Sequence, residues 1–312
     1  IEERRQEVEA RVGNKDEAPE MLNGVTVALV HDLDAGHDEE QDQHNQCEQK
    51  GFKHAFPRQI VVASCFASRG KRSEIGMTLS LFGRRSALFL PASNPRAVAK
   101  ARMAGADLVI LDLEDAVKPE NKEAARAAAV EAVAEPWPCP VAIRVNGFAS
   151  EWHGADVEAV AESRADFVVV PRVEGAAVVQ EVKALTGKPV AAMIETPLGI
   201  LRAEAIAEEA AALIAGTNDL RASLRLPDGA GRAQISASLQ MIVLAARAAG
   251  VPAFDGVFNR LEDVEGFSAE AREGRLLGFD GKTLIHPNQV EPCHAAWAPT
   301  KAELARAERL VA

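Results

Sequence analysis

Residues 189–219 read PVAAMIETPLGILRAEAIAEEAAALIAGTND, and this stretch contains the repeating unit of the chain. Two short apolar runs, PVAAMIET and LIAGTND, are separated by an Ala-rich segment that is typical of a helix. Both runs are largely apolar without alternation, which is typical of strands that are buried on both faces of a parallel sheet. The stretch therefore predicts two parallel strands joined by a crossover helix.

The same unit recurs along the chain. Runs rich in β-formers begin near eight positions, which are Ser86, Asp107, Pro140, Phe167, Pro189, Ala212, Pro252 and Gly281. Strand and helix alternating eight times predict a (β/α)₈ TIM barrel. The chain has 312 residues, which leaves room for one barrel of ~250 residues.

The segments between these runs carry helix signals. Asn94 is placed as an N-cap, Pro95 takes the first helical position, and Gly105 is expected just past the end. Further Ala-rich helices are predicted over residues 119–135, 174–187 and 231–250. An open doubly wound sheet is the alternative, but it requires a Gly-rich phosphate turn after the first strand. The turn here reads PASNPR, without a G-x-G, so the barrel is preferred.

Residues 1–76 differ from the rest of the chain. The stretch HDLDAGHDEEQDQHNQCEQK is polar and aperiodic, and such segments rarely bury enough apolar surface to become ordered. Its His and acidic residues raise the alternative of a metal-binding tract, and a solvated polar segment is favoured. We expect a low-order extension over 1–76, with Met77 as the natural start, and a barrel domain over 77–298.

Bulk properties exclude several classes of protein. The net charge of −11 disfavours a nucleic-acid or anionic-membrane partner. No apolar run reaches ~18 residues, and the first ten residues lack the apolar stretch of a signal peptide. None of the cysteines (Cys47, Cys65, Cys139 and Cys293) forms a C-x-x-C pair, so we expect a reduced, cytoplasmic protein without disulfides.

Polar residues end the predicted strands, where barrels of this kind place their active sites. Glu195 and Asp219 follow neighbouring strands, so their carboxylates are expected to converge. Two carboxylates at short range repel unless a proton or a cation lies between them. Mg²⁺ suits such a pair because it takes one or two carboxylates plus substrate oxygens. Arg144, two strands away, can fork onto a substrate carboxylate; a structural salt-bridge network is the alternative.

Six motifs in one order carry a family resemblance. RRSALFLPASNPR, LDLEDAV, RVN, IETPLG, GTNDL and GFDGKTLIHPNQV together resemble the HpcH/HpaI aldolase and citrate lyase β-subunit family, over about residues 84–298. The resemblance is to the CoA-ester lyase branch, which includes citrate lyase β-like proteins and malyl-CoA lyases. It implies a Mg²⁺-dependent lyase that breaks or forms a C–C bond between an acyl thioester and a 2-oxo acid.

The resemblance also implies roles for individual residues. Glu195 and Asp219 are expected to hold Mg²⁺, and Arg144 to bind the carboxylate of the oxo acid. The acidic residues of the LDLED motif are expected to line the metal site, often through water; they are Asp112, Glu114 and Asp115. The S-N-P-R turn makes Arg96 a candidate for a CoA phosphate contact, with Arg85 as a second candidate.

Four other residues receive interpretations without a firm role. Asp255 is interpreted as a polar residue of the barrel wall, with a catalytic base as the alternative. His286 is interpreted as a hydrogen-bonded histidine at the barrel rim. Arg172 is left open between a phosphate contact and a rim ion pair. Cys139 has no basic neighbour in sequence that would activate its thiol.

The chain departs from the resemblance at its C-terminal end. Many members of the branch continue into a lid with a G-x-M-[IV]-D-x-P motif, whose aspartate is proposed to act in acid–base chemistry. That motif is absent, and residues 299–312 are expected to be the start of a truncated helical lid. We expect metal and oxo-acid binding to survive this loss, whereas turnover needs the exclusion of water that a lid provides.

Three functions are weighed on these grounds. The first is the Mg²⁺-dependent lyase acting on acyl-CoA or acyl-carrier-protein thioesters with glyoxylate, pyruvate or oxaloacetate. The second is a malyl-CoA-type thioesterase, because the same site can polarise a carbonyl for attack by water. The third is a catalytically silent fragment that holds metal and oxo acid. A homo-oligomer is expected from the resemblance.

Overall fold

The computed structural model describes residues 80–311, which form a closed barrel of eight parallel strands in sequence order. The strands are Ser86–Pro91 (β1), Leu108–Asp112 (β2), Val141–Arg144 (β3), Phe167–Val170 (β4), Val190–Ile194 (β5), Ala212–Ala215 (β6), Ala253–Asp255 (β7) and Gly281–Leu284 (β8). β1 also pairs with β8 and closes the barrel. The (β/α)₈ prediction is confirmed, whereas the expected extension over 1–76 and the start at Met77 lie outside the described residues.

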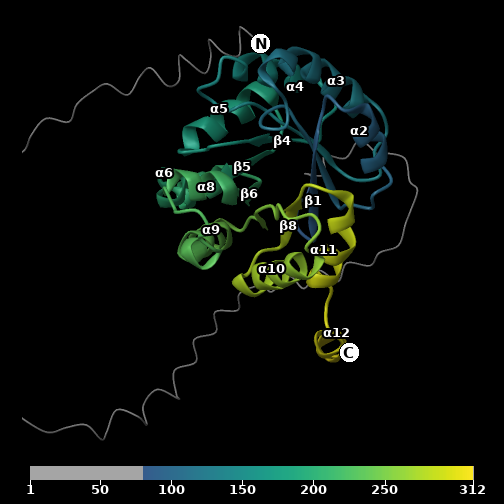
Figure 1. Cartoon of the computed structure of the whole chain (residues 1–312), viewed down its shortest axis with the longest axis vertical. Helices are drawn as coiled ribbons and strands as arrows, with labels where there is room; N and C mark the ends of the chain where they lie inside the picture. The colour runs from purple at the N-terminus through teal and green to yellow at the C-terminus, as the bar shows by residue number, and fades with distance from the viewer. Residues whose placement is uncertain (1–79, 312) are drawn as a thin grey trace, which may run out of the picture. The chain divides into compact units, whose positions relative to one another are not determined.

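Helices surround the barrel (Figure 1). They are Pro95–Ala101 (α2), Lys122–Ala134 (α3), His153–Glu162 (α4), Ala176–Thr186 (α5), Pro197–Leu201 (α6), Ala203–Glu209 (α7), Thr217–Ser223 (α8), Ser236–Ala249 (α9), Val264–Leu277 (α10) and Val290–Trp297 (α11). Lys301–Val311 (α12) follows them in the chain. Short 3₁₀ turns precede α3, α9 and α11 at Pro119–Asn121, Ala233–Ile235 and Pro287–Gln289.

The first helix begins where its sequence signals predict. The Asn94 side chain accepts a hydrogen bond from the Ala97 amide, and Pro95 occupies the first turn. The helix ends at Ala101, earlier than predicted. Gly105 lies beyond it with a φ of 72°, so this glycine serves the turn into β2 and does not cap the helix.

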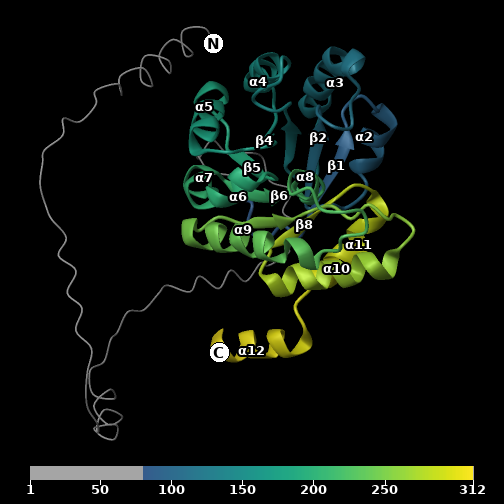
Figure 2. The ribbon, with the colours of Figure 1, turned by 60° about the vertical axis from the view of Figure 1, so that its left-hand side comes forward.

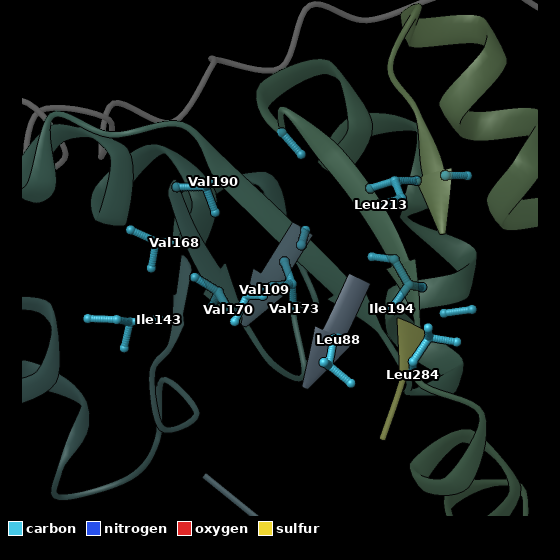
Figure 3. Packing of buried hydrophobic residues seen from close by; sticks show 14 of the residues in the cluster. Leu88, Val109, Ile143, Val168, Val170, Val173, Val190, Ile194, Leu213 and Leu284 are labelled. Atoms are coloured by element: carbon cyan, nitrogen blue, oxygen red, sulfur yellow. The ribbon is translucent and has the colours of Figure 1, made fainter. Parts of the chain in front are cut away.

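Each strand buries both of its faces. One face packs outward against the helices, in a core that includes Leu88, Val109 and Ile143 (Figure 3). The other face fills the barrel interior with side chains such as Phe89 and Phe254. This two-sided burial explains why the strands are continuously apolar in sequence and do not alternate.

A polar layer closes the interior at the carboxyl ends of the strands. Asp112 ends β2 and lies directly opposite Arg144, which ends β3. Asp112 and Arg144 share the inward face with Ile110 and Ala142, which lie two residues earlier in the same strands. The same alternation turns Glu195 inward, two residues after the interior Met193.

The last helix differs from the others because none of its residues is buried. In Figure 2, α12 lies apart from the helices around the barrel. Its described contact with α10 is the ion pair between Arg275 Nη2 and Glu303 Oε1, at 2.9 Å. Among residues 80–311, no helix is long and apolar enough to span a membrane.

Candidate active site

A cavity of about 340 Å³ opens at the carboxyl ends of the strands. Asp112, Arg144, Glu195 and Asp219 contribute polar groups to its wall, and Phe89 is among its apolar neighbours. The volume lies in the range of small-molecule sites. The structure therefore brings the three central predicted residues, Arg144, Glu195 and Asp219, to one cavity.

The two predicted metal ligands reach the cavity from different kinds of element. Glu195 follows β5 directly and is 3% exposed. Asp219 does not end β6 as predicted; it lies in the first turn of α8. Arg172 links the two residues, because its main-chain N–H donates to Glu195 Oε1 at 2.7 Å and its Nη1 donates to Asp219 Oδ2 at 3.3 Å.

Glu195 keeps one carboxylate oxygen available. Oε2 accepts no hydrogen bond from the described residues, whereas Oε1 is held by Arg172. Burial and, after it, the charge of Asp219 raise the pKa of Glu195 to about 7, against the lowering effects of the Arg172 N–H and of Arg144. The pocket around Glu195 depends on Gly216, because a Cβ built there would lie 2.1 Å from Oε2.

Arg144 is 7% exposed and is held by a two-pronged ion pair. Its Nε and Nη2 donate to Asp112 Oδ1 and Oδ2 at 2.7 and 2.6 Å. Its Nη1 lies 2.8 Å from Glu114 Oε2 and 3.3 Å from Asp115 Oδ2. These carboxylates raise the pKa of Arg144 above its usual value despite burial, so the guanidinium stays charged.

Asp112 holds Arg144 and lines the cavity with Glu195 and Asp219, and its predicted water-mediated place around the metal stays a prediction. Besides the two bonds from Arg144, its Oδ1 accepts the amide of Glu114 at 2.8 Å and its Oδ2 accepts the amide of Ala116 at 3.0 Å. Both oxygens are therefore committed to four donors. Asp112 fixes the orientation of Arg144 and the turn that follows β2.

The other two acids of the LDLED motif differ in exposure. The Asp115 side chain is 69% exposed and lines the cavity, so it remains within reach of a ligand there. Glu114 is more enclosed: burial raises its pKa, Arg144 lowers it, and the nearby charges of Asp115, Glu195 and Asp112 raise it, to about 8 in all. Glu114 lines a second, neighbouring cavity of about 640 Å³, together with Asp115, Lys122 and Arg172.

The donor set of the cavity fits magnesium. Over residues 80–311 no group of three or more His, Cys, Asp or Glu side chains is arranged to hold a metal, which disfavours a closed zinc site. Glu195 and Asp219 supply two hard oxygen donors, and Mg²⁺ is commonly bound by one or two carboxylates with water and substrate completing the shell. The free Oε2 of Glu195 in its glycine-lined pocket satisfies this requirement.

The two candidate CoA contacts lie at opposite ends of the barrel. Arg96 is exposed near the start of α2, just after the carboxyl end of β1, and its contact with CoA stays a prediction. Arg85 precedes β1 at the amino ends of the strands, where its main-chain N–H and Nε donate to Asp107 Oδ2. That position, remote from the carboxyl ends, does not support a contact with the thioester.

The structure resolves the remaining interpretations. Asp255 points toward α10, where it pairs with Lys282 and Arg232 at 2.9 Å each, as expected of a polar residue in the barrel wall. His286 Nδ1 accepts the amide of Asn288 at 3.2 Å. Arg172 forms the rim ion pair that sequence left open. Burial raises the pKa of the Cys139 thiol to about 11, so this thiol is not activated.

Sequence reasoning missed a buried lysine beneath the acidic turn. Lys122 is 6% exposed, and its Nζ donates to Leu113 O and Glu114 O at 2.7 Å each and to Asn146 Oδ1 at 2.6 Å. It thereby ties the turn after β2 to the end of β3. In sequence it is one lysine at the start of an Ala-rich helix, and nothing there distinguishes it from a solvated side chain.

The fold and the cavity define an α/β barrel that presents an acid pair and a clamped arginine at the carboxyl ends of its strands. The chain belongs to the HpcH/HpaI aldolase/citrate lyase family, whose family model matches residues 85–287. The predicted resemblance is confirmed.

Two curated relatives illustrate the range of the family. The chain is 43% identical over 234 residues to a (3S)-malyl-CoA thioesterase of Cereibacter sphaeroides (strain ATCC 17029 / ATH 2.4.9), covering 73% of this chain and 82% of the relative. It is 36% identical over 245 residues to the citrate lyase subunit beta of Escherichia coli (strain K12), covering 73% and 81%.

Solved structures of CitE from Mycobacterium tuberculosis share the fold. A complex with magnesium, acetoacetate and coenzyme A superposes with a TM-score of 0.66 and 37% identity, over 75% of this chain and 87% of that one. A complex of the same organism's citrate lyase beta subunit with oxaloacetate and magnesium gives a TM-score of 0.63 and 36% identity, over 69% and 97%.

Proposed function

We propose that the protein is a Mg²⁺-dependent lyase that breaks or forms a C–C bond between an acyl thioester, on CoA or an acyl carrier protein, and a 2-oxo acid. The observation that carries the proposal is the cavity that places the free oxygen of Glu195, the carboxylate of Asp219 and the guanidinium of Arg144 together. Related proteins bound to magnesium with oxaloacetate, or with acetoacetate and coenzyme A, support this assignment.

Each residue has a defined part in the proposed reaction. Glu195 and Asp219 would hold the magnesium ion, which when bound supplies Lewis-acid stabilisation to oxygens of the oxo acid. Arg144 binds the carboxylate of the oxo acid with Nη1, because Asp112 occupies its other two nitrogens. The substrate carboxylate replaces the contact of Nη1 with the exposed Asp115.

During cleavage, a general base takes the hydroxyl proton of the 3-hydroxyacyl thioester, the hydroxyl oxygen becomes the carbonyl oxygen of the 2-oxo acid, and the C–C bond breaks. The bond electrons pass to the thioester fragment as an enolate, which takes up a proton at carbon and becomes the acyl thioester. Arg144 stabilises the oxo-acid end in both states. The buried apolar side chains of Phe89 and Met193 line the cavity and limit the access of water to the enolate.

A thioesterase acting on malyl-CoA-like esters is the second candidate. The 43% identity to a (3S)-malyl-CoA thioesterase favours it. Product analysis separates the two functions, because hydrolysis releases free CoA and a hydroxy acid, whereas lyase action releases an acyl-CoA and a 2-oxo acid.

We also propose that residues 299–312, which include α12, are the start of a helical lid. All of its residues lie outside the core, and Leu304, Leu310 and Val311 expose apolar surface. Such a surface suits a segment that packs on another element in the active assembly.

The test combines turnover with ligand binding. Thioesters of malate, citramalate, methylmalate and citrate are assayed with and without Mg²⁺, and the binding of glyoxylate and oxaloacetate is measured by calorimetry with Mg²⁺ present. We expect Glu195→Ala and Asp219→Ala to lose metal-dependent binding of the oxo acid. Glu204→Ala, an exposed acid on α7, is the matched control and should behave like the wild type. Unchanged titrations in both site variants would refute the metal site.

A further inference from the structure

Arg172 adopts a strained backbone beside both predicted metal ligands. Its φ is 51°, and among residues 80–311 the only other non-glycine residue with positive φ is Arg225. A left-handed conformation costs an L-residue roughly 1–2 kcal/mol, and strain of this kind persists where surrounding structure requires it. Here the conformation accompanies a main-chain N–H that donates to Glu195 Oε1 at 2.7 Å.

The side chain of Arg172 contacts the second acid of the pair. Its Nη1 lies 3.3 Å from Asp219 Oδ2, and this is its one ion pair within the described residues. The Arg172 side chain is 52% exposed and the Asp219 side chain 35% exposed, so the pair lies at the mouth of the cavity. One residue therefore holds Glu195 through its backbone and neutralises Asp219 through its side chain.

A metal ion and this guanidinium compete for the same carboxylate. A divalent cation bound to Asp219 would repel a guanidinium at hydrogen-bond distance from the same group. The exposed side chain has room to move away, because it also borders the second cavity. Breaking an exposed ion pair of this kind costs up to about 1 kcal/mol, so the competition is modest in size.

We propose that Arg172 is the internal counter-cation of the metal site, which pairs with Asp219 in the metal-free protein and lowers the affinity of the site for Mg²⁺. The proposal rests on the proposed function, because it takes Glu195 and Asp219 as the metal-binding acids. It assigns Arg172 a positioning role through its N–H and a competing role through its charge.

The test titrates the metal-stripped full-length protein with MgCl₂ by calorimetry, without any other ligand. Arg172→Gln removes the charge and keeps the main-chain N–H that holds Glu195. We expect its Kd for Mg²⁺ to fall by about threefold or more, the size of a lost exposed ion pair, and the difference to shrink in high salt. Arg225→Gln is the matched control, because Arg225 is also an exposed arginine with positive φ, at 54°, and should leave the Kd unchanged.

Thermal unfolding gives a second readout. Arg172→Gln should lower the Tm more in EDTA than in saturating Mg²⁺, because the ion pair exists in the metal-free protein. If Arg172→Gln does not fold, Arg172→Gly removes the same charge at a φ that glycine accepts. An unchanged or weaker Mg²⁺ affinity in the uncharged variant overturns the proposal while the proposed function stands. A wild-type protein that binds no Mg²⁺ overturns both.

Discussion

Replacing Gly216 by alanine tests whether the position of Glu195 determines metal binding. A Cβ at residue 216 would lie 2.1 Å from Glu195 Oε2, 2.4 Å from its Cβ and 2.9 Å from its Cδ. Ordinary contacts begin at 3.4 Å, so Glu195 or the backbone has to shift by about 1 Å. Because the clash includes the Cβ of Glu195, a rotation of its carboxylate alone does not relieve it.

This shift has two expected consequences. Overpacking of a tight site lowers the free energy of unfolding by about 1–3 kcal/mol, measured by urea titration. The displaced Glu195 also loses its 2.7 Å bond to the Arg172 amide, and we expect the Kd for Mg²⁺ to rise by about tenfold or more, which is 1.4 kcal/mol or more. Turnover, where it is measurable, should fall by about a hundredfold.

The control for this variant is Gly147→Ala. Gly147 lies in the turn after β3, at the same end of the barrel, and a Cβ there meets no heavy atom within 4 Å. It should bind Mg²⁺ as the wild type does. If Gly216→Ala, shown to be folded by its urea transition, binds Mg²⁺ with the wild-type Kd, then the geometry of Glu195 does not govern the site and the reasoning fails.

Three further predictions concern neighbouring residues. Asp112→Asn weakens the paired hydrogen bonds from Arg144 Nε and Nη2, so oxo-acid binding should weaken by about tenfold while the Kd for Mg²⁺ stays unchanged. A loss of Mg²⁺ binding would show that Asp112 also supports the metal ion. The pKa of Glu195 is raised to about 7, so the metal-free protein should lose stability as pH rises through that value, and Mg²⁺ should bind more tightly at about pH 8 than at about pH 6. The Tm in EDTA checks the first expectation and calorimetry with MgCl₂ checks the second. A Tm and a Kd that do not change with pH over this range would contradict them. Asp255→Ala removes one of the two acidic partners of the buried Lys282, so the free energy of unfolding should fall by about 3–5 kcal/mol, while the folded protein keeps its Mg²⁺ affinity. An unchanged free energy of unfolding would contradict the importance of this buried ion pair.

The fold was predictable because the barrel imposes one rule on all eight strands. A strand that packs helices on one side and the barrel interior on the other is apolar throughout, as in FVVV at residues 167–170. Helix ends were less predictable. Gly105 has the left-handed φ of a helix-ending glycine, yet it lies in the turn after α2, because sequence does not show how many residues that turn needs.

The site was predictable in its members and less so in their arrangement. Strand alternation places Glu195 inward, and α8, which follows the neighbouring strand β6, brings Asp219 to the same cavity. The part played by Asp112 was hidden, because it depends on which donors occupy its two oxygens, and two of the four are main-chain amides. The same limit applies to Arg172, whose decisive contact with Glu195 comes from a backbone N–H that every residue type provides.

Charge balance gives a reason, independent of any relative, for a divalent cation at this end of the barrel. Five carboxyl groups gather around two guanidinium groups there; they belong to Asp112, Glu114, Asp115, Glu195 and Asp219, with Arg144 and Arg172. With all of them ionised, the group carries three excess negative charges. Burial raises the pKa of Glu114 to about 8 and, with the charge of Asp219, that of Glu195 to about 7, and the buried ammonium of Lys122 lies beneath the same turn, so part of this excess is offset near pH 7.

A magnesium ion would offset much of the remaining excess. Without it, the carboxylate of an oxo acid would approach Arg144 through a field of like charge, and the fork on Asp112 already satisfies two of the arginine's nitrogens. With it, the approaching anion would meet a less negative site that contains a fixed guanidinium and a hard cation. Oxo-acid binding should therefore depend on metal even though Arg144 itself is preformed, and calorimetry with glyoxylate in EDTA should show no binding; measurable metal-free affinity would mean that Arg144 alone governs recognition.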